Sequence, residues 1–381
     1  MATRICILTS AHTVNDTRIF HREAKTLAQA GYQTVLAGIG TNHIKSAPHL
    51  AAVKNPVAIH QFPAPGSRIK RFIFSLPRYL RFALRIRADI YHLHDPELLP
   101  LALILKILNR RVVCDIHEDY YRQIPDKRYV PRPFRTLLAS LYNNWEKFVA
   151  RHIDGVVTAT DTIAQRLSSS ARHLVTVKNY PEPFPSHQPA PSHYAQSAPN
   201  GPFRIVHLAR ILTPERGITL LLDALAQLPD CELLLAGKFS PSSYENEIKN
   251  HPAYPRVRHL GVIPHPDCFR WYATSNVGVV PSLPVLGYEF ALPVKMFEFM
   301  SAGLPVIVPD FPPLRAIIKE CACGLTFSPG DATSLADALR TIKFHPEQAR
   351  KMGKNGQDAV NKIYNWSNEE KKLLKFYERI I

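Results

Sequence analysis

The sequence lacks the signals that mark secreted, zinc-binding or membrane-spanning proteins. Its six cysteines form no Cys-x-x-Cys pair, which argues against zinc ribbons and thioredoxin-like redox sites. The longest apolar stretch, Leu98 to Leu105, is far shorter than the roughly 20 residues that a spanning helix needs. The N-terminal apolar run, Ile5–Leu8, is also too short for a signal peptide. We therefore expect a protein of the reducing cytosol.

Acidic residues are scarce in the first half of the chain. Residues 1–180 hold 26 Lys or Arg and 12 Asp or Glu, a charge of +14, and residues 181–381 hold 21 and 19, a charge of +2. Such an excess indicates a half that faces a membrane, a phosphorylated substrate or nucleic acid. Because no nucleic-acid recognition motif accompanies the charge, we expect no nucleic-acid partner.

Short apolar segments alternate with amphipathic ones in two parts of the chain, which is typical of α/β domains. The predicted strands of the first part are Arg4–Thr9, Gln33–Gly38, Ala58–Phe62, Ile90–His94, Val112–Ile116, Gly155–Ala159 and Leu174–Lys178. Those of the second are Phe203–Leu208, Glu232–Ala236, Val257–Leu260, Val277–Pro281, Val306–Val308 and Gly324–Phe327. The main predicted helices are Arg18–Ala30, Phe134–Arg151, Leu220–Leu228, Asp267–Ala273, Val294–Ala302, Leu314–Lys319 and Ala332–Phe344.

Between these parts, Pro181 to Pro202 has seven prolines in 22 residues and reads as a linker. The predicted architecture is two doubly wound, Rossmann-like domains facing a central cleft. Residues 1–182 and 203–362 form the domains, 183–202 the linker, and 363–381 a helix that either continues the second domain or crosses back to the first. Doubly wound sheets bind ligands at the carboxyl ends of their strands, so the cleft is the expected site.

The stretch from Pro281 to Pro305 predicts a phosphate and ribose site. A helix that begins near Pro293 would expose the N–H groups of Val294 and Lys295 to an anion. One turn on, Glu298 would accept hydrogen bonds from two ribose hydroxyls. The alternative is a solvated helix with an incidental Lys–Glu pair.

A second stretch, Ile205 to Gly217, places two arginines after the first strand of the second domain. Arg210 follows the strand and Arg216 precedes the next helix. Two guanidinium groups at a carboxyl end could clamp a diphosphate in bidentate fashion. The alternative is two ordinary surface arginines.

Together these stretches resemble the retaining, nucleotide-sugar-dependent glycosyltransferases of the GT-B fold, specifically glycosyltransferase family 4. The similar segments occur in the family's order: TRIFHREAKTLAQAGYQTVLAG, HDPELLPLALILK, VVCDIHED, VHLARILTPERGI, LLLAGKF, HLGVIP, VVPSL and KMFEFMSAGLPVIVPD. The resemblance implies a nucleoside diphosphate sugar as donor, no cofactor and no metal. The absence of an Asp-x-Asp pair also disfavours the metal-dependent GT-A class.

The resemblance also implies roles for the donor residues. Arg210 and Arg216 match the family's basic pair on the diphosphate, and Glu298 matches the glutamate that holds the ribose. The family's first glutamate falls at Phe290, and Glu289 is out of register by one. Contact with the donor sugar is therefore expected from the backbone of Ala291–Val294, which includes Leu292 and Pro293. The Gly261–Pro264 stretch, with Ile263, matches the segment that reads the nucleobase.

In the first domain the resemblance assigns His117 to the donor sugar. Polar loops at other strand ends carry Asp16 and Arg18, and His94 and Asp95, and all are expected to face the cleft. A competing interpretation is a metal-dependent hydrolase. Its ligands would come from His92, His94, Asp95, His117, Glu118 and Asp119, but it leaves the second domain unexplained.

The segment Ser67–Ala88 has seven basic residues and no acidic one. Helical spacing places its main arginines on one side: Arg71, Arg78, Arg81 and Arg85. Pro77 is expected to divide the segment into a lead-in and a main helix. Basic residues interleaved with aromatics indicate binding to an anionic membrane surface. An ordinary solvated helix face is the alternative.

We therefore predict transfer of a sugar, with retention, to a lipid-diphosphate-linked glycan acceptor at the inner face of the cytoplasmic membrane. Bacterial polysaccharide or O-antigen assembly is the kind of pathway that the resemblance implies. The sequence offers no obvious enzymic nucleophile, so front-face attack by the acceptor hydroxyl is preferred. A nucleotide-sugar epimerase and a non-catalytic nucleotide-sugar binder are the alternatives.

Overall fold

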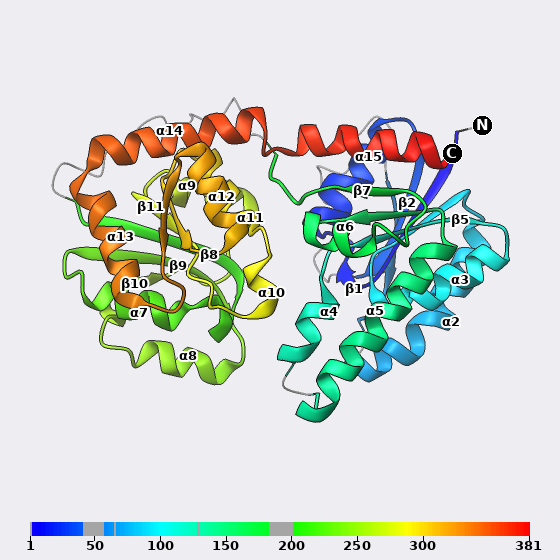
Figure 1. The fold of residues 1–381 in the computed structure, drawn as a ribbon, viewed down its shortest axis with the longest axis horizontal. Coiled ribbons are helices and arrows are strands. Elements are labelled where there is room, and N and C mark those ends of the chain that lie inside the picture. The colour runs from blue at the N-terminus through cyan, green and yellow to red at the C-terminus, as the bar shows by residue number, and fades with distance from the viewer. Residues whose placement is uncertain (1, 41–56, 65, 128–129, 183–200) are drawn as a thin grey trace. The chain divides into compact units, whose positions relative to one another are not determined.

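The computed structural model describes residues 2–40, 57–64, 66–127, 130–182 and 201–381. The chain forms two compact units (Figure 1). Unit 1 consists of Met1–Asn179 and Ser367–Ile381, and unit 2 consists of Tyr180–Trp366. The chain passes from unit 1 to unit 2 after Asn179, three residues before the expected end of the first domain at 182. It returns to unit 1 after Trp366, four residues after the expected end of the second domain at 362. The predicted linker falls almost wholly outside the described residues.

Unit 1 is built on a sheet of seven parallel strands in the order β3-β2-β1-β4-β5-β6-β7. The strands are β1 (Arg4–Thr13), β2 (Gln33–Ile39), β3 (Ala58–Phe62), β4 (Ile90–Leu93), β5 (Arg111–Ile116), β6 (Gly155–Thr158) and β7 (Leu174–Thr176). Since β2 and β4 flank β1, the strand order reverses at β1. The polar loops after β1, β4 and β5 therefore meet at one edge of the sheet.

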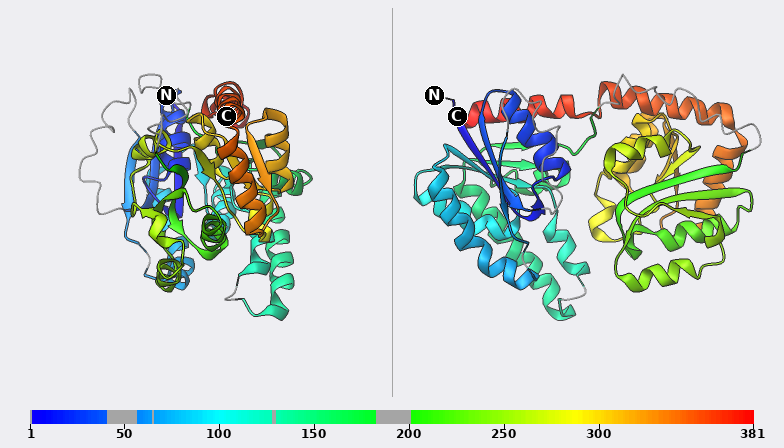
Figure 2. Two further views of the ribbon diagram at one scale, coloured as in Figure 1. Left: turned by 90° about the vertical axis from the view of Figure 1, so that its left-hand side faces the viewer. Right: turned by 180° about the vertical axis from the view of Figure 1, so that it is seen from behind.

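Helices cover both faces of this sheet (Figure 2). The helical segments of unit 1 are η1, a π-helix (Thr17–Ala24), α1 (Lys25–Gln29), α2 (Arg68–Ile86), α3 (Leu99–Ile107), α4 (Tyr120–Gln123), α5 (Arg135–His152), α6 (Asp161–Leu167) and α15 (Trp366–Ile380). Helices α2, α3 and α5 lie side by side and share one buried apolar cluster with the sheet (Figure 1).

The C-terminal helix α15 packs on unit 1. The Tyr377 hydroxyl lies 2.8 Å from Nδ1 of His92 on β4, and the backbone N–H of Lys178 donates to Glu369 at 2.8 Å. A Cβ added to Gly155 would lie 2.4 Å from Cζ of Phe376, so the helix approaches β6 where glycine leaves room. Of the two courses open to residues 363–381, the structure shows the crossing back to unit 1.

Pro77 does not divide the basic segment, contrary to expectation, because α2 continues through it. Proline removes one backbone hydrogen bond, but Pro77 lies on the exposed side of the helix. The turns that follow it are held by the buried side chains of Tyr79, Phe82 and Ala83. The sequence analysis also missed a long helix, α14 (Pro346–Lys362).

Unit 2 contains a six-stranded parallel sheet in the order β10-β9-β8-β11-β12-β13. The strands are β8 (Phe203–Leu212), β9 (Cys231–Phe239), β10 (Val257–His259), β11 (Val277–Val279), β12 (Val306–Pro309) and β13 (Gly324–Phe327). The helices are α7 (Ile218–Ala226), α8 (Ser242–Lys249), α9 (Cys268–Tyr272), α10 (Leu286–Glu289), α11 (Val294–Ser301), α12 (Pro312–Cys321), α13 (Ala332–Phe344) and α14. Here the strand order reverses at β8. Among the described residues, no helix is both long and apolar enough to span a bilayer.

Candidate functional site

In unit 2, polar side chains gather around the buried carboxylate of Glu298 on α11. It accepts hydrogen bonds from the Tyr272 hydroxyl at 2.8 Å, Lys295 Nζ at 2.8 Å and His265 Nε2 at 3.0 Å. Burial alone would raise the pKa of Glu298, but the charge of Lys295 and the hydrogen bond from His265 lower that pKa to about 2. Glu298 is therefore an ionised carboxylate fixed in place. If one of its three hydrogen-bond donors moved away, the carboxylate would be able to accept hydrogen bonds from two neighbouring hydroxyl groups of a ligand.

The start of α11 provides backbone donors for an anion. Pro293 is the N-cap residue, with no side-chain cap, and Val294 and Lys295 open the helix. Their N–H groups have no acceptor within the helix. Ile263, Leu292, Pro293 and Val294 are all partly exposed, so the predicted contacts with base and sugar are open to a ligand. Glu289 ends α10, and Phe290 follows it.

Two arginines of unit 2 have no carboxylate partner among the residues that the structure describes. Arg210 is exposed near the end of β8, and Arg216 lies in the turn before α7. Neither guanidinium makes a hydrogen bond or ion pair with the described residues. The pKa of His207 falls to about 4, first through burial and then partly through the charges of Arg216 and Lys295. Arg216 and Lys295 are therefore both near enough to His207 to act on its charge.

The turn that carries Arg216 reaches the end of β11 through a glycine. Gly217 has a φ of 74°, in the left-handed region, and a Cβ at this position would lie 1.9 Å from the Pro281 carbonyl oxygen. Any other residue would push the turn away from β11. The glycine thus brings Arg216 toward the start of the segment that ends in α11.

In unit 1, two histidines meet at the edge where the strand order reverses. His12 Nε2 of β1 lies 3.4 Å from His117 Nε2, which follows β5. His12 also lies 3.5 Å from each of Asp16 and Asp95. Burial opposes protonation, but the hydrogen bond to Asp16 and the charge of Asp95 raise the pKa of His12 to about 9. A protonated imidazole therefore stands beside His117 at neutral pH.

Beneath His117 lies a buried ion-pair network centred on Asp115. The carboxylate approaches His117 Nδ1 at 3.3 Å and Arg18 Nη2 at 2.8 Å. Arg18 Nε is also 3.0 Å from Glu23. Burial would raise the pKa of Asp115, but the charges of Arg18 and the histidines hold it well below its usual range. Asp115 is therefore an anion that orients the His117 ring.

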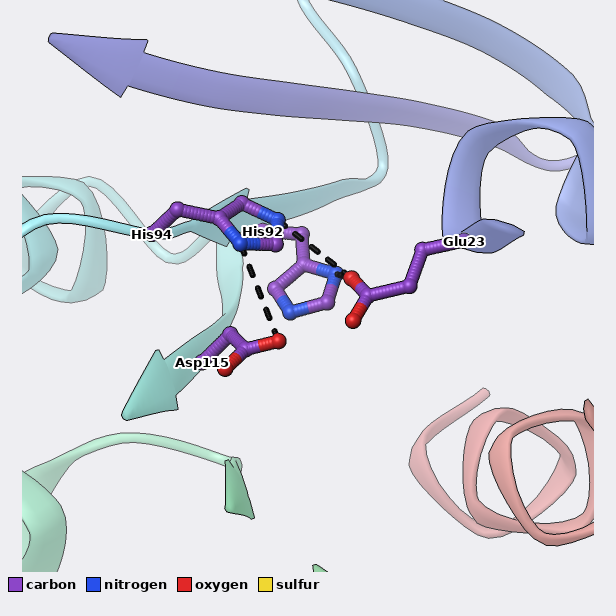
Figure 3. Close-up of side chains that lie close together, drawn as sticks. All are labelled: Glu23, His92, His94 and Asp115. Atoms are coloured by element: carbon purple, nitrogen blue, oxygen red, sulfur yellow. Dashed lines mark ion pairs between the residues drawn. The ribbon is translucent and has the colours of Figure 1, made fainter. Parts of the chain in front are cut away.

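Four residues of this region lie close enough to be considered as metal ligands: Glu23, His92, His94 and Asp115 (Figure 3). It is the one such group in the described parts of the chain, and it shares only His92 and His94 with the ligand set predicted from sequence. Arg18 already contacts both carboxylates, so a divalent ion would bring a second positive charge next to the guanidinium. We interpret the group as part of the buried network around Arg18 and Asp115, in which burial raises the pKa of Glu23 and lowers those of His92 and His94.

The structure places three predicted ligand-binding residues inside unit 1. Arg18 and His94 are 4% and 3% exposed and belong to the ion-pair network. The buried Asp95 accepts hydrogen bonds from the loop after β1, including Thr9 Oγ1 at 2.8 Å and the N–H of Ser10 at 2.6 Å. The expectation that these three face a ligand is corrected, because each holds the loops that carry other site residues. His117 and Asp16 remain partly exposed.

The four arginines of α2 differ in their partners and in their exposure. Arg71 pairs with the buried Glu97 at 2.5 Å. The Arg78 guanidinium lies over the Phe62 ring at 5.7 Å from its centre. Arg81 and Arg85 are exposed.

The sequence analysis missed His12 because it read the first strand as ending at Thr9. A signal was present, since a polar run from Thr9 to Asp16 follows the apolar strand. The partners of Glu298 were missed for another reason: Tyr272 and His265 are 26 and 33 residues away along the chain.

Comparisons with known proteins agree with this architecture. A family model described as "Glycosyl transferase 4-like domain" matches residues 17–179, and one described as "Glycosyl transferases group 1" matches residues 202–343. A phosphatidyl-myo-inositol mannosyltransferase of Mycobacterium leprae is 23% identical over 338 residues, which cover 85% of this chain and 80% of that protein.

Solved structures show the same fold. Sucrose-phosphate synthase of Thermosynechococcus elongatus has a TM-score of 0.75 at 22% identity, with 99% of both chains covered. Anabaena Alr3699/HepE in complex with UDP-glucose has a TM-score of 0.71 at 16% identity, again with 99% of both chains covered. The two matched domains and the shared fold identify the chain as a GT-B glycosyltransferase of the family 4 type.

Proposed function

We propose that the protein transfers a sugar from a nucleoside diphosphate sugar, with retention and without a metal, to a lipid-linked glycan in cell-surface polysaccharide synthesis. The observation that carries the donor half is the carboxyl edge of unit 2. There, free helix N–H groups and two arginines without carboxylate partners in the described parts of the chain accompany a fixed carboxylate. This is the set of groups that a nucleoside diphosphate requires.

In this proposal Arg210, Arg216 and the start of α11 hold the donor diphosphate. Negative charge develops on the diphosphate as the bond to the sugar breaks, so cations fixed there stabilise the transition state more than the ground state. Glu298 accepts hydrogen bonds from the ribose hydroxyls in place of His265, its most exposed partner. The partly exposed backbone around Leu292 and Ile263 contacts the sugar and base.

Unit 1 supplies the acceptor side. His117, held by Asp115, positions the transferring sugar and stabilises the positive charge that builds on it. Asp16 is partly exposed, close to His12, and is the candidate ligand for the acceptor glycan. The acceptor hydroxyl attacks from the face that the diphosphate leaves, which retains the anomeric configuration.

Membrane association at the inner leaflet is supported by apolar side chains on α5 and the turn before it. Helical spacing places them on an arc of about 100°: Phe134, Leu137, Leu138, Leu141 and Phe148, all exposed. Basic residues occur along the same segment: Arg132, Arg135, Lys147 and Arg151. The one acidic residue of α5, Glu146, is buried and paired with Arg166 at 2.6 Å. The lipid named for the mycobacterial relative is consistent with a lipid acceptor.

A thermal-shift screen of UDP-, GDP-, ADP- and dTDP-sugars tests the donor half. One class should raise the melting temperature of the wild type, because a ligand that binds only the folded state stabilises it. Glu298→Gln should reduce the rise, and Glu289→Gln, a matched change at the neighbouring out-of-register carboxylate, should not. If none of the nucleotides shifts the wild type, the proposal is wrong.

A further inference from the structure

The arginines of α2 line two neighbouring hollows on unit 1. The first, of about 150 Å³, is lined in part by Ser10, Arg71, Ser75 and Arg78. The second, of about 440 Å³, is lined in part by Arg78, Arg81 and Arg85. Arg78 and the aromatic rings of Phe62 and Phe74 belong to both. Arg71 thus lines only the first hollow, Arg81 and Arg85 line only the second, and Arg78 lies between them.

The first hollow adjoins the histidine site. Ser10 precedes His12 by two residues on β1, and its hydroxyl donates to Glu97 at 2.9 Å. Glu97 also pairs with Nε of Arg71. No contact of the two Arg71 η nitrogens is found among the described residues. The Arg71 guanidinium is therefore held through Nε, and the N–H groups of its two η nitrogens remain available to a ligand.

Arg78 contributes the positive charge of the first hollow. Its protein contacts are a long bond from Nη1 to the Pro63 carbonyl oxygen at 3.4 Å and the face of the Phe62 ring. Within the described residues it has no carboxylate at ion-pair distance. A guanidinium held against an aromatic ring, with only one long hydrogen bond to a carbonyl oxygen, suits the bidentate binding of phosphate.

We propose that Arg71 and Arg78 bind the phosphate group of the acceptor, whose glycan lies toward Ser10 and the His12–His117 pair. This inference rests on the proposed function, because it requires the lipid-linked acceptor to carry a diphosphate between lipid and glycan. The exposed Phe74 and Leu84 lie on the same helix, where the lipid would follow the diphosphate. Arg81 and Arg85 then face the lipid headgroups and do not read the acceptor.

Inorganic pyrophosphate is the probe that tests this site. It is titrated into the full chain after the donor site is saturated with the nucleoside diphosphate that the thermal-shift screen selects. Arg78→Gln should weaken pyrophosphate binding about tenfold or more, the effect of losing a charge-assisted contact. Arg85→Gln makes the same change of charge on the same helix and should leave the affinity unchanged. Arg71→Lys, which keeps the charge beside Glu97, should weaken binding less than Arg78→Gln.

Co-sedimentation with vesicles of phosphatidylcholine and phosphatidylglycerol separates the acceptor diphosphate from a lipid headgroup. The paired variant Arg81→Gln/Arg85→Gln should bind vesicles more weakly, whereas Arg78→Gln should bind them like the wild type. The proposal is overturned if pyrophosphate does not bind, or if Arg78→Gln affects vesicles and not pyrophosphate. If either of these results were found while nucleotide binding stayed normal, only this inference would be contradicted, and the proposed donor site would not be affected.

Discussion

At the scale of single residues, both sites depend on charges whose partners come from distant segments. The spacing of Lys295 and Glu298 on one helix could be read from the sequence, and their contact is found at 2.8 Å. The buried hydroxyl of Tyr272 and the imidazole of His265 could not, because side chains 26 and 33 residues away meet Glu298 only after the sheet has formed. The sequence predicted the carboxylate and the lysine whose charge does most to lower its pKa, and the fold adds the hydrogen bond from His265.

The unpaired guanidinium of Arg216 makes a specific prediction. Arg216→Gln should weaken binding of the nucleoside diphosphate about tenfold, because it removes a charge-assisted contact to phosphate. It should leave binding of the bare nucleoside unchanged. Arg350→Gln, which removes an exposed arginine paired with Glu347 on α14, is the matched control. Equal losses for nucleoside and diphosphate, measured by isothermal titration calorimetry, would contradict the assignment.

The raised pKa of His12 predicts how stability changes with pH. The folded protein keeps this proton up to about pH 9, whereas the unfolded chain releases it near 6.5. The stabilisation is fully present below pH 6.5 and is lost as the pH rises through 9. We expect the free energy of unfolding to fall by about 2 kcal/mol over this window, after allowance for the partial exposure of the ring.

Urea unfolding of wild type and His12→Gln across the same pH window measures this effect. The variant should show a flatter dependence, since the group that loses its proton is gone. Parallel curves for the two proteins would assign the pH dependence to other groups.

At the scale of secondary-structure elements, α15 packs closely on unit 1. Gly155→Ala should destabilise the protein by about 1–3 kcal/mol, because the new methyl group would overlap the Phe376 ring. Gly66→Ala, where the added group meets nothing within 4 Å, is the control. Chemical denaturation of both variants tests the contact. Equal stability would show that α15 moves at no cost.

The strands were the most predictable elements, and the helices less so. Both sheets have the predicted strands because buried parallel strands read as short apolar runs between polar loops. The effect of Pro77 was predicted wrongly, because the free energy that a proline costs inside α2 is offset by the burial of Tyr79, Phe82 and Ala83. This packing cannot be read from one sequence. The polar helix α14 gave too weak an apolar pattern to be recognised.

The apolar arc on α5 should bind lipid. Replacing Leu137 and Leu141 with Gln should lower vesicle binding about tenfold or more, because each leucine would lose burial in the membrane interface. Thr136→Gln, an exposed change on the same helix, should have no effect. Unchanged co-sedimentation of the double variant with anionic vesicles would argue against this surface.

At the scale of the whole molecule, the proposed function assigns one task to the basic half and another to the nearly neutral half. The sequence predicted two Rossmann-like domains and a nearly neutral second half, in which a few positioned arginines can hold the nucleotide. It could not predict that the buried Arg18, His94 and Asp95 would support the site from within. Their burial depends on how β1, β4 and β5 align, which one sequence does not contain.

The most direct test of the central claim is sugar transfer itself. Release of nucleoside diphosphate from the selected donor is measured with and without a lipid-linked glycan acceptor, in wild type, Glu298→Gln and Glu289→Gln. We predict release that depends on the acceptor, falls by at least about tenfold in Glu298→Gln and persists in Glu289→Gln. Acceptor-dependent release that is unchanged in Glu298→Gln would contradict the account.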